Sequence, residues 1–209
     1  MKNNQREFIE YARDYAETCR YHIWLGGSFR RGNPTPFSDV DISAWMGRDA
    51  LTSFIYGYGD PLYISCTTNP EGIIIVIYKD GVAVDLEVIE SIDVTDNCFF
   101  HLERIKDHEF CRNSSICKEI CPRGDHSYQT ARLFHRSLIK YLSGKKETGA
   151  SVANEIAAFL DIDPVTESDY KNGITNLIDC FHAKYPLDTD YRNLCFELVG
   201  LIDAGTDIE

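Results

Sequence analysis

The spacing of apolar residues changes about halfway along the chain. In the first half, short apolar or alternating runs end at glycines and at an Asp-Gly pair, which is typical of strands joined by turns. In the second half, apolar residues recur every three or four positions, which predicts amphipathic helices. The expected strands cover residues 21–25, 38–42, 62–67, 73–78 and 82–90, beside helices at 5–20 and 48–57. The later helices are expected at 127–142, capped by Ser127, and at 150–160, 168–184 and 190–203.

These patterns predict an α+β fold in two domains. Residues 1–110 are expected to form an α/β domain with a mixed sheet, and residues 111–209 a helical bundle. The boundary is placed only within residues 93–125, where the sequence has no clear period. A chain of 209 residues with a hydrophobic fraction of 44% can bury a proper core.

The stretch from Gly26 to Ile42 joins a Gly-Gly-Ser turn to two acids. Exposed backbone N–H groups beside Ser28 suit phosphate oxygens, and Arg30 and Arg31 could add charge to the same phosphates. In a strand, Asp39 and Asp41 would share one face, as ligands for hard metal ions do. Either half of this stretch is also compatible with an ordinary loop and a solvated strand edge.

A third acidic strand follows the expected hairpin turn at Asp80-Gly81. Alternation places Val84 and Leu86 on one face and Asp85 and Glu87 on the other. Asp85 is the preferred third acid of a site with Asp39 and Asp41. Glu87 lies on the same face and stays open as an alternative, as does the interpretation of both as solvated acids.

The Gly26 to Ile42 stretch resembles the signature of the nucleotidyltransferase superfamily (polymerase β-like). The resemblance is carried by Gly27-Ser28, Arg31, Gly32 and Ser38-Asp39-Val40-Asp41, and is greatest to the minimal and aminoglycoside enzymes. The segment from Lys79 to Ile89 is similar to streptomycin-type adenylyltransferases.

This resemblance implies transfer of a nucleoside monophosphate, AMP from ATP, to a hydroxyl with release of pyrophosphate. It implies that Gly27, Ser28, Arg31 and Ser38 bind the nucleotide. It also implies that Asp39, Asp41 and Asp85 are catalytic and hold two Mg²⁺ ions. The general base is left open between Asp85, Glu87 and a residue of the helical half.

The net charge of −12 bears on the partners. Surfaces for long nucleic acids are normally basic, so a small and cationic acceptor such as an aminoglycoside-like antibiotic is favoured. A protein-adenylylating minimal nucleotidyltransferase of a toxin–antitoxin pair and a non-catalytic nucleotide-binding module are the alternatives. Without a leader-like or membrane-spanning stretch, we expect a soluble cytoplasmic protein.

Cysteine and histidine gather between residues 101 and 126. Thiolate and imidazole are the ligands that zinc prefers, but the Cys-x5-Cys-x3-Cys spacing is not a common zinc knuckle. With eight cysteines in the chain and no secretion signal, reduced thiols are expected. The tract consists of His101, His108, Cys111, Cys117, Cys121 and His126.

Overall fold

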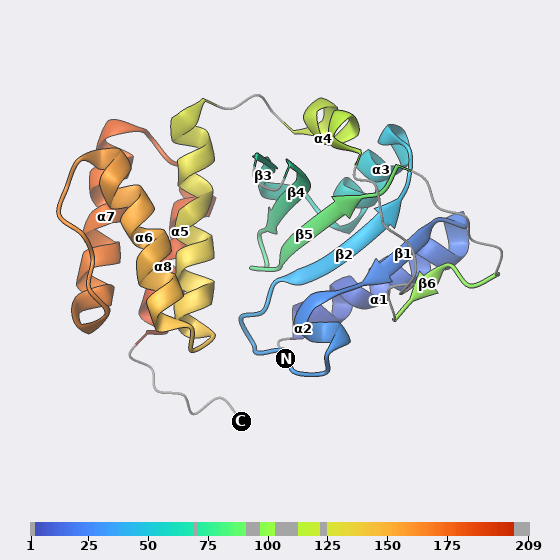
Figure 1. Cartoon of the computed structure of the whole chain (residues 1–209), viewed down its shortest axis with the longest axis horizontal. Coiled ribbons are helices and arrows are strands. Elements are labelled where there is room, and N and C mark those ends of the chain that lie inside the picture. The colour runs from blue at the N-terminus through green and yellow to red at the C-terminus, as the bar shows by residue number, and fades with distance from the viewer. Residues whose placement is uncertain (1–2, 69–70, 91–96, 103–112, 122–124, 203–209) are drawn as a thin grey trace. The chain divides into compact units, whose positions relative to one another are not determined.

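The computed structural model describes residues 3–68, 71–90, 97–102, 113–121 and 125–202 (Figure 1). It confirms the α+β fold, with a mixed sheet in the first half and helices in the second. The chain divides into two compact units, Met1–Arg123 and Gly124–Glu209. No helix in the described part of the chain is long and apolar enough to cross a bilayer.

The first unit is built on a six-stranded sheet in the order β3-β4-β5-β2-β1-β6. Strands β1 and β2, β3 and β4, and β4 and β5 pair antiparallel, while β2 pairs with β5, and β1 with β6, in parallel. The sheet is therefore mixed. Its strands are β1 (His22–Leu25), β2 (Val40–Trp45), β3 (Pro61–Thr68), β4 (Glu71–Tyr78), β5 (Ala83–Val88) and β6 (Phe100–His101).

Three helices contribute to the core beneath one face of this sheet. They are α1 (Asn3–Cys19), α3 (Arg48–Tyr58) and α4 (Ser114–Ile120), and a four-residue helix α2 (Gly27–Arg30) follows β1. Alternate residues of β2 and β5 enter the core, so the residues between them lie on the opposite face. The buried core includes Phe8, Ala12, Leu51, Phe54, Val40, Ile42, Ala44, Val84, Leu86 and Val88.

The second unit is a bundle of α5 (His126–Leu142), α6 (Lys146–Leu160), α7 (Tyr170–Lys184) and α8 (Thr189–Gly200), with a 3₁₀ turn, η1 (Glu167–Asp169), before α7. Helices α5 and α6 approach closely at Gly149, where an added Cβ would lie 2.7 Å from Tyr141 Cβ. The Ser137 hydroxyl donates to Gly149 O across 2.7 Å and lies 2.5 Å from the Tyr170 hydroxyl. Small residues and a satisfied polar contact thus hold the first pair of helices together.

Two sequence-based expectations need correction. The cap of α5 is Asp125, not Ser127, because the Asp125 carboxylate accepts the Tyr128 N–H across 2.9 Å. Ser127 instead donates its hydroxyl to that carboxylate. The strand expected at 38–42 begins at Val40 and continues to Trp45, so Asp39 precedes it.

Candidate active site

The turn after β1 is shaped around one carboxylate. Gly26 is extended, and its N–H donates to Asp41 O across 2.8 Å. Gly27 has a φ of +56°, in the left-handed region, and a Cβ added there would lie 1.6 Å from Asp41 Oδ2. Only glycine fits this position, because a side chain would meet both backbone strain and the carboxylate.

The acids of β2 and β5 lie side by side in the sheet. Asp41 pairs in register with Asp85, and Ser43 with Glu87. Because parallel partners in register face the same way, the two pairs form successive rows, about 6.6 Å apart, on the face away from the helices. The Ser43 hydroxyl donates to Glu87 Oε2 across 2.8 Å. Asp41 and Asp85 thus make one carboxylate row, with Glu87 in the row beyond it.

A pocket of about 350 Å³ opens over these rows. Its charged wall combines two guanidinium groups with three carboxylates, so it offers cationic groups to phosphate and anionic groups to a metal ion or an amine. The lining residues are Trp24, Leu25, Gly26, Gly27, Arg30, Arg31, Asp41, Ile42, Ser43, Ile73, Asp85 and Glu87.

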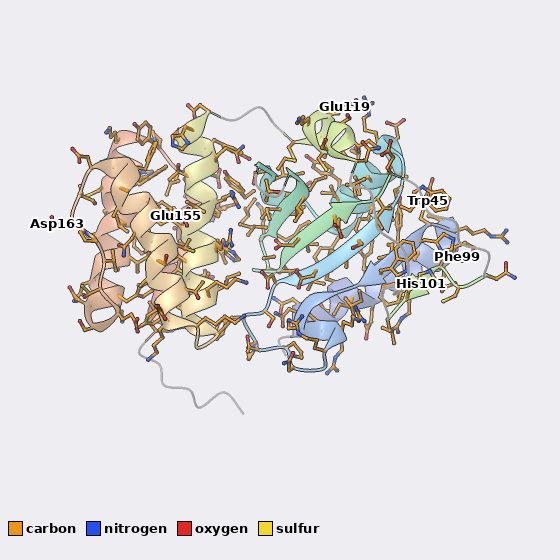
Figure 2. The ribbon with its side chains drawn as sticks, in the orientation of Figure 1. Trp45, Phe99, His101, Glu119, Glu155 and Asp163 are labelled. Carbon is orange, nitrogen blue, oxygen red and sulfur yellow. The ribbon has the colours of Figure 1, made fainter. Side chains whose placement is uncertain are left out.

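An aromatic stack supports the wall of the pocket that Trp24 forms. The indole of Trp24 stacks on the imidazole of His101, with ring centroids 4.8 Å apart and an interplanar angle of 9°. His101 Nε2 lies 3.0 Å from Nδ1 of His22, so β6 is tied to β1 by a side-chain contact as well as by pairing. Figure 2 shows His101 with Phe99 and Trp45 at this edge of the sheet.

Ser28 contributes a buried hydroxyl in the first turn of α2. Its Oγ has no hydrogen-bond partner among the described residues. An unpaired buried hydroxyl is costly unless a ligand or water completes it. Ser28 is therefore suited to donate to an anion bound at the Gly26-Gly27 turn.

Ser38 and Asp39 lie in the loop before β2, outside the residues that line the pocket. The Ser38 hydroxyl accepts the Thr35 N–H across 2.9 Å, and Ser38 O accepts Gln5 Nε2 across 2.5 Å. Gln5 is 4% exposed, so α1 anchors the segment that leads into Asp41. In this arrangement Ser38 shapes the loop.

The site fits a hard divalent metal ion in the manner typical of Mg²⁺. Its donors are carboxylate oxygens, and Gly27 leaves room for the Asp41 carboxylate. Within the described residues, no three or more His, Cys, Asp or Glu side chains form a ready metal-binding group. Proteins usually hold Mg²⁺ with one or two carboxylates plus substrate phosphates.

Residues 6–47, from α1 to the end of β2, match the model of a family described as the nucleotidyltransferase domain. The match supports the nucleotidyltransferase superfamily for this part of the chain. The match includes the Gly26-Gly27 turn, Asp39 and Asp41 and ends before β5, so it does not reach Asp85. A comparison with curated proteins found no match.

Within the first unit, the structure brings Gly27, Arg31, Asp41 and Asp85 to one pocket and places Ser28 in the adjoining helix turn. Trp24, Ser43 and Ile73 also line it and were not anticipated. Ser43 could have been found, because it lies two residues after Asp41 and so on the same face of the strand. Trp24 and Ile73 reach the pocket because of the order of the strands in the sheet. That order leaves no local signal in the sequence.

The Cys/His tract is dispersed in the structure. Cys117 and Cys121 belong to α4 and its C-cap, His101 to β6, and His126 begins α5. His108 and Cys111 fall outside the described residues. The carboxyl-rich pocket, not this tract, is therefore the candidate active site.

Proposed function

We propose that this protein transfers a nucleoside monophosphate, AMP from ATP, to a hydroxyl group of a small cationic acceptor and releases pyrophosphate. One observation carries the proposal: Asp41 and Asp85 lie in register on adjacent parallel strands and face one pocket with the glycine turn and two arginines. This arrangement provides the positioning and charge that phosphoryl transfer requires, since the protein takes little part in the bond making itself.

Residues at the Gly26-Gly27 end of the pocket would hold the triphosphate. Helix α2 begins there, and the first N–H groups of a helix have no partner within it. Arg30 and Arg31 supply fixed positive charge, and Ser28 a hydroxyl donor. These groups orient the phosphate chain and favour the departure of pyrophosphate by stabilising its negative charge.

Asp41 and Asp85 would hold Mg²⁺ together with the phosphates, and Asp39 could join them through a shift of the loop before β2. The metal supplies charge neutralisation and a template for in-line displacement. Asp85 would also accept the proton of the acceptor hydroxyl, with Glu87 in the next row as the alternative base. Each role requires the carboxylate to be ionised.

The acceptor is proposed to be cationic because a further carboxylate, that of Glu87, lines the pocket beside Asp41 and Asp85. Glu87, oriented by Ser43, lies one row beyond Asp85 on the same face. An ammonium group on the acceptor would be attracted by this carboxylate and by the net charge of −12. Aminoglycoside-like compounds combine such amines with hydroxyls.

The test is an acceptor screen with Mg²⁺ and each of the four nucleoside triphosphates. Aminoglycosides, lincosamides and neutral polyols serve as acceptors, and pyrophosphate release and product mass are measured. We expect a product heavier by one nucleotide with an amine-bearing acceptor and ATP. Failure of all small acceptors, with ATP still bound, would contradict the proposed acceptor class.

A variant pair separates binding from chemistry. Asp41→Asn should lower the rate of product formation by about 10²–10³. It should also weaken Mg²⁺-dependent ATP binding, measured with a fluorescent ATP analogue. Asp60→Asn changes an exposed acid before β3 and should leave both intact. If ATP binding does not respond to Asp41→Asn, the pocket is not the nucleotide site.

A further inference from the structure

Three cysteines that are distant in sequence converge on the helix-covered face of the sheet. Cys66 lies on β3 and pairs with Ile74 of β4, while Cys117 and Cys121 come from α4 and its C-cap. Helix α4 packs on β4 and β5 (Figure 1). The Cys117 thiol donates to Gly72 O across 3.4 Å, which fixes α4 at the start of β4. We call Cys66, Cys117 and Cys121 the thiol cluster.

Within the thiol cluster, the Cys66 sulfur interacts with the other two thiols. These interactions, that with Cys117 first, lower the pKa of Cys66 well below its ordinary value. The Lys118 ammonium acts in the same direction. The pKa of Cys121 is raised, first by its hydrogen bond to Cys66 and then by burial. The interaction therefore favours ionisation of Cys66 over ionisation of Cys121.

The three cysteines also differ in their exposure to solvent, and Cys66 is again the exception. Cys66 is half-buried, whereas Cys117 is 0% exposed and Cys121 is 7% exposed. A stabilised and accessible thiolate is the form that reacts with oxidants, and buried thiols in apolar surroundings are inert. None of the three forms a disulfide in the structure.

We propose that Cys66 is an oxidation site whose product is an intramolecular disulfide with Cys121. The oxidant is a hydroperoxide such as hydrogen peroxide. The Cys66 thiolate attacks one peroxide oxygen, an S–O bond forms, the O–O bond breaks, and hydroxide leaves, so that Cys66 becomes a sulfenic acid. The Cys121 thiol then attacks the Cys66 sulfur. An S–S bond forms, the S–O bond breaks, and the hydroxyl leaves with the thiol proton as water.

The overall step balances as two thiols and one hydrogen peroxide giving one disulfide and two waters. The thiols lose two electrons and the peroxide gains them. Cys121 is assigned as the partner because Cys117 already donates its thiol to Gly72 O. The disulfide would tie the end of α4 to β3, and a shift of the sulfurs from hydrogen-bond contact to a bond of about 2.05 Å would be required.

The experiment uses the full chain, purified without chelator under reducing conditions and then freed of reductant. At pH 6, iodoacetamide should label Cys66 about tenfold faster than Cys180, a half-buried cysteine of α7 outside the thiol cluster. One equivalent of hydrogen peroxide should then produce a tryptic peptide pair joined through Cys66 and Cys121 by mass spectrometry under non-reducing conditions. The oxidised chain should also unfold at a higher Tm than the reduced chain, and a thiol reductant should reverse both changes.

Cysteine variants and a measurement of bound zinc complete the test of the proposed disulfide. Cys121→Ser should leave Cys66 reactive but trap it as a sulfenic acid, detected with dimedone, whereas Cys180→Ser should change neither step. Labelling of Cys66 in the native chain needs no variant, so a folding defect would not hide the result. Slow labelling of Cys66, a disulfide with another partner, or one zinc per chain that is lost in Cys66→Ser would overturn the proposal.

Discussion

On strands β2 and β5, neighbouring residues lie on opposite faces of the sheet and have different roles. On the helix-covered face, Ile42 and Leu86 are at most 2% exposed and pack in the core of the first unit. On the other face, Asp41 and Asp85 line a pocket. A one-residue step along either strand thus separates a group that stabilises the fold from a group suited to chemistry. Changes on one face should therefore affect stability, and changes on the other should affect activity.

The largest expected effect is on the polar face. Asp85→Asn keeps the shape of the side chain but removes its charge, as does Asp41→Asn. Each should lower the rate of nucleotide transfer by about 10²–10³, which corresponds to roughly 3–4 kcal/mol of lost transition-state stabilisation. The rate is measured as pyrophosphate release at saturating substrate concentrations. Glu90→Gln, an exposed acid just after β5, is the matched control and should retain full activity. A rate above one tenth of the original for Asp85→Asn would contradict its role.

The next largest effect is on the apolar face. Leu86→Ala removes a fully buried side chain from the core and should reduce the free energy of unfolding by about 2–5 kcal/mol. Denaturant titration followed by circular dichroism measures this loss. The rate per folded molecule should stay close to the original, because Leu86 points away from the pocket. If Leu86→Ala and Asp85→Asn lost equal stability, the claim that only the apolar face contributes to stability would be contradicted.

Local sequence patterns correctly predicted which residues of β5 lie on each face and where the turn before it forms. Alternation in 82–90 correctly separated Leu86 from Asp85, and the Asp80-Gly81 turn is formed, with the Gly81 N–H donating to Tyr78 O across 3.0 Å. The register of Asp41 with Asp85 could not be derived from sequence, because it is a parallel pairing between strands far apart in the chain. Periodicity reports which face a residue occupies and not which strand lies beside it.

The same limit explains what was missed. The two-residue strand β6 and the short helix α4 carry too little periodicity to be recognised, and both are held by distant partners. Asp39 shares a strand face with Asp41 only if the strand begins before it. The hydrogen bond from Gln5 to Ser38 O, across 33 positions, is one of the long-range contacts that define this loop. Such contacts have no signature in the Asp-Val-Asp sequence itself.

A third variant tests whether the close contact between Gly27, in the turn after β1, and the Asp41 carboxylate is needed for activity. Gly27→Ala places a methyl group where the Asp41 carboxylate lies and forces a residue with a side chain into a left-handed conformation. Displacement of a reacting group by about 1 Å can cost roughly 10²-fold in rate, so a loss of that order is expected. Steady-state pyrophosphate release measures the rate, and thermal unfolding the stability.

The control for that variant is Gly32→Ala. Gly32 also has a positive φ, of 72°, but a Cβ there would meet nothing within 4 Å. It should therefore show only the backbone cost, about 1–2 kcal/mol, with the rate retained. If both glycine variants lose activity equally, backbone strain and not the contact with Asp41 is responsible.

The smallest expected effect lies in the second row of the polar face. Ser43→Ala removes the hydroxyl that donates to Glu87 Oε2 but leaves the carboxylate in place. A hydrogen bond to a charged group contributes about 1.5–3 kcal/mol at most when buried, and solvent at this half-buried pair reduces it, so we expect a three- to tenfold change. If Glu87 orients the acceptor, the change will appear in the KM for an amine-bearing acceptor, with the KM for ATP unaltered. Ser43→Thr keeps a hydroxyl donor and should restore the original KM. A fall in kcat alone would instead assign Glu87 to proton transfer, because the acceptor would then bind normally and react slowly.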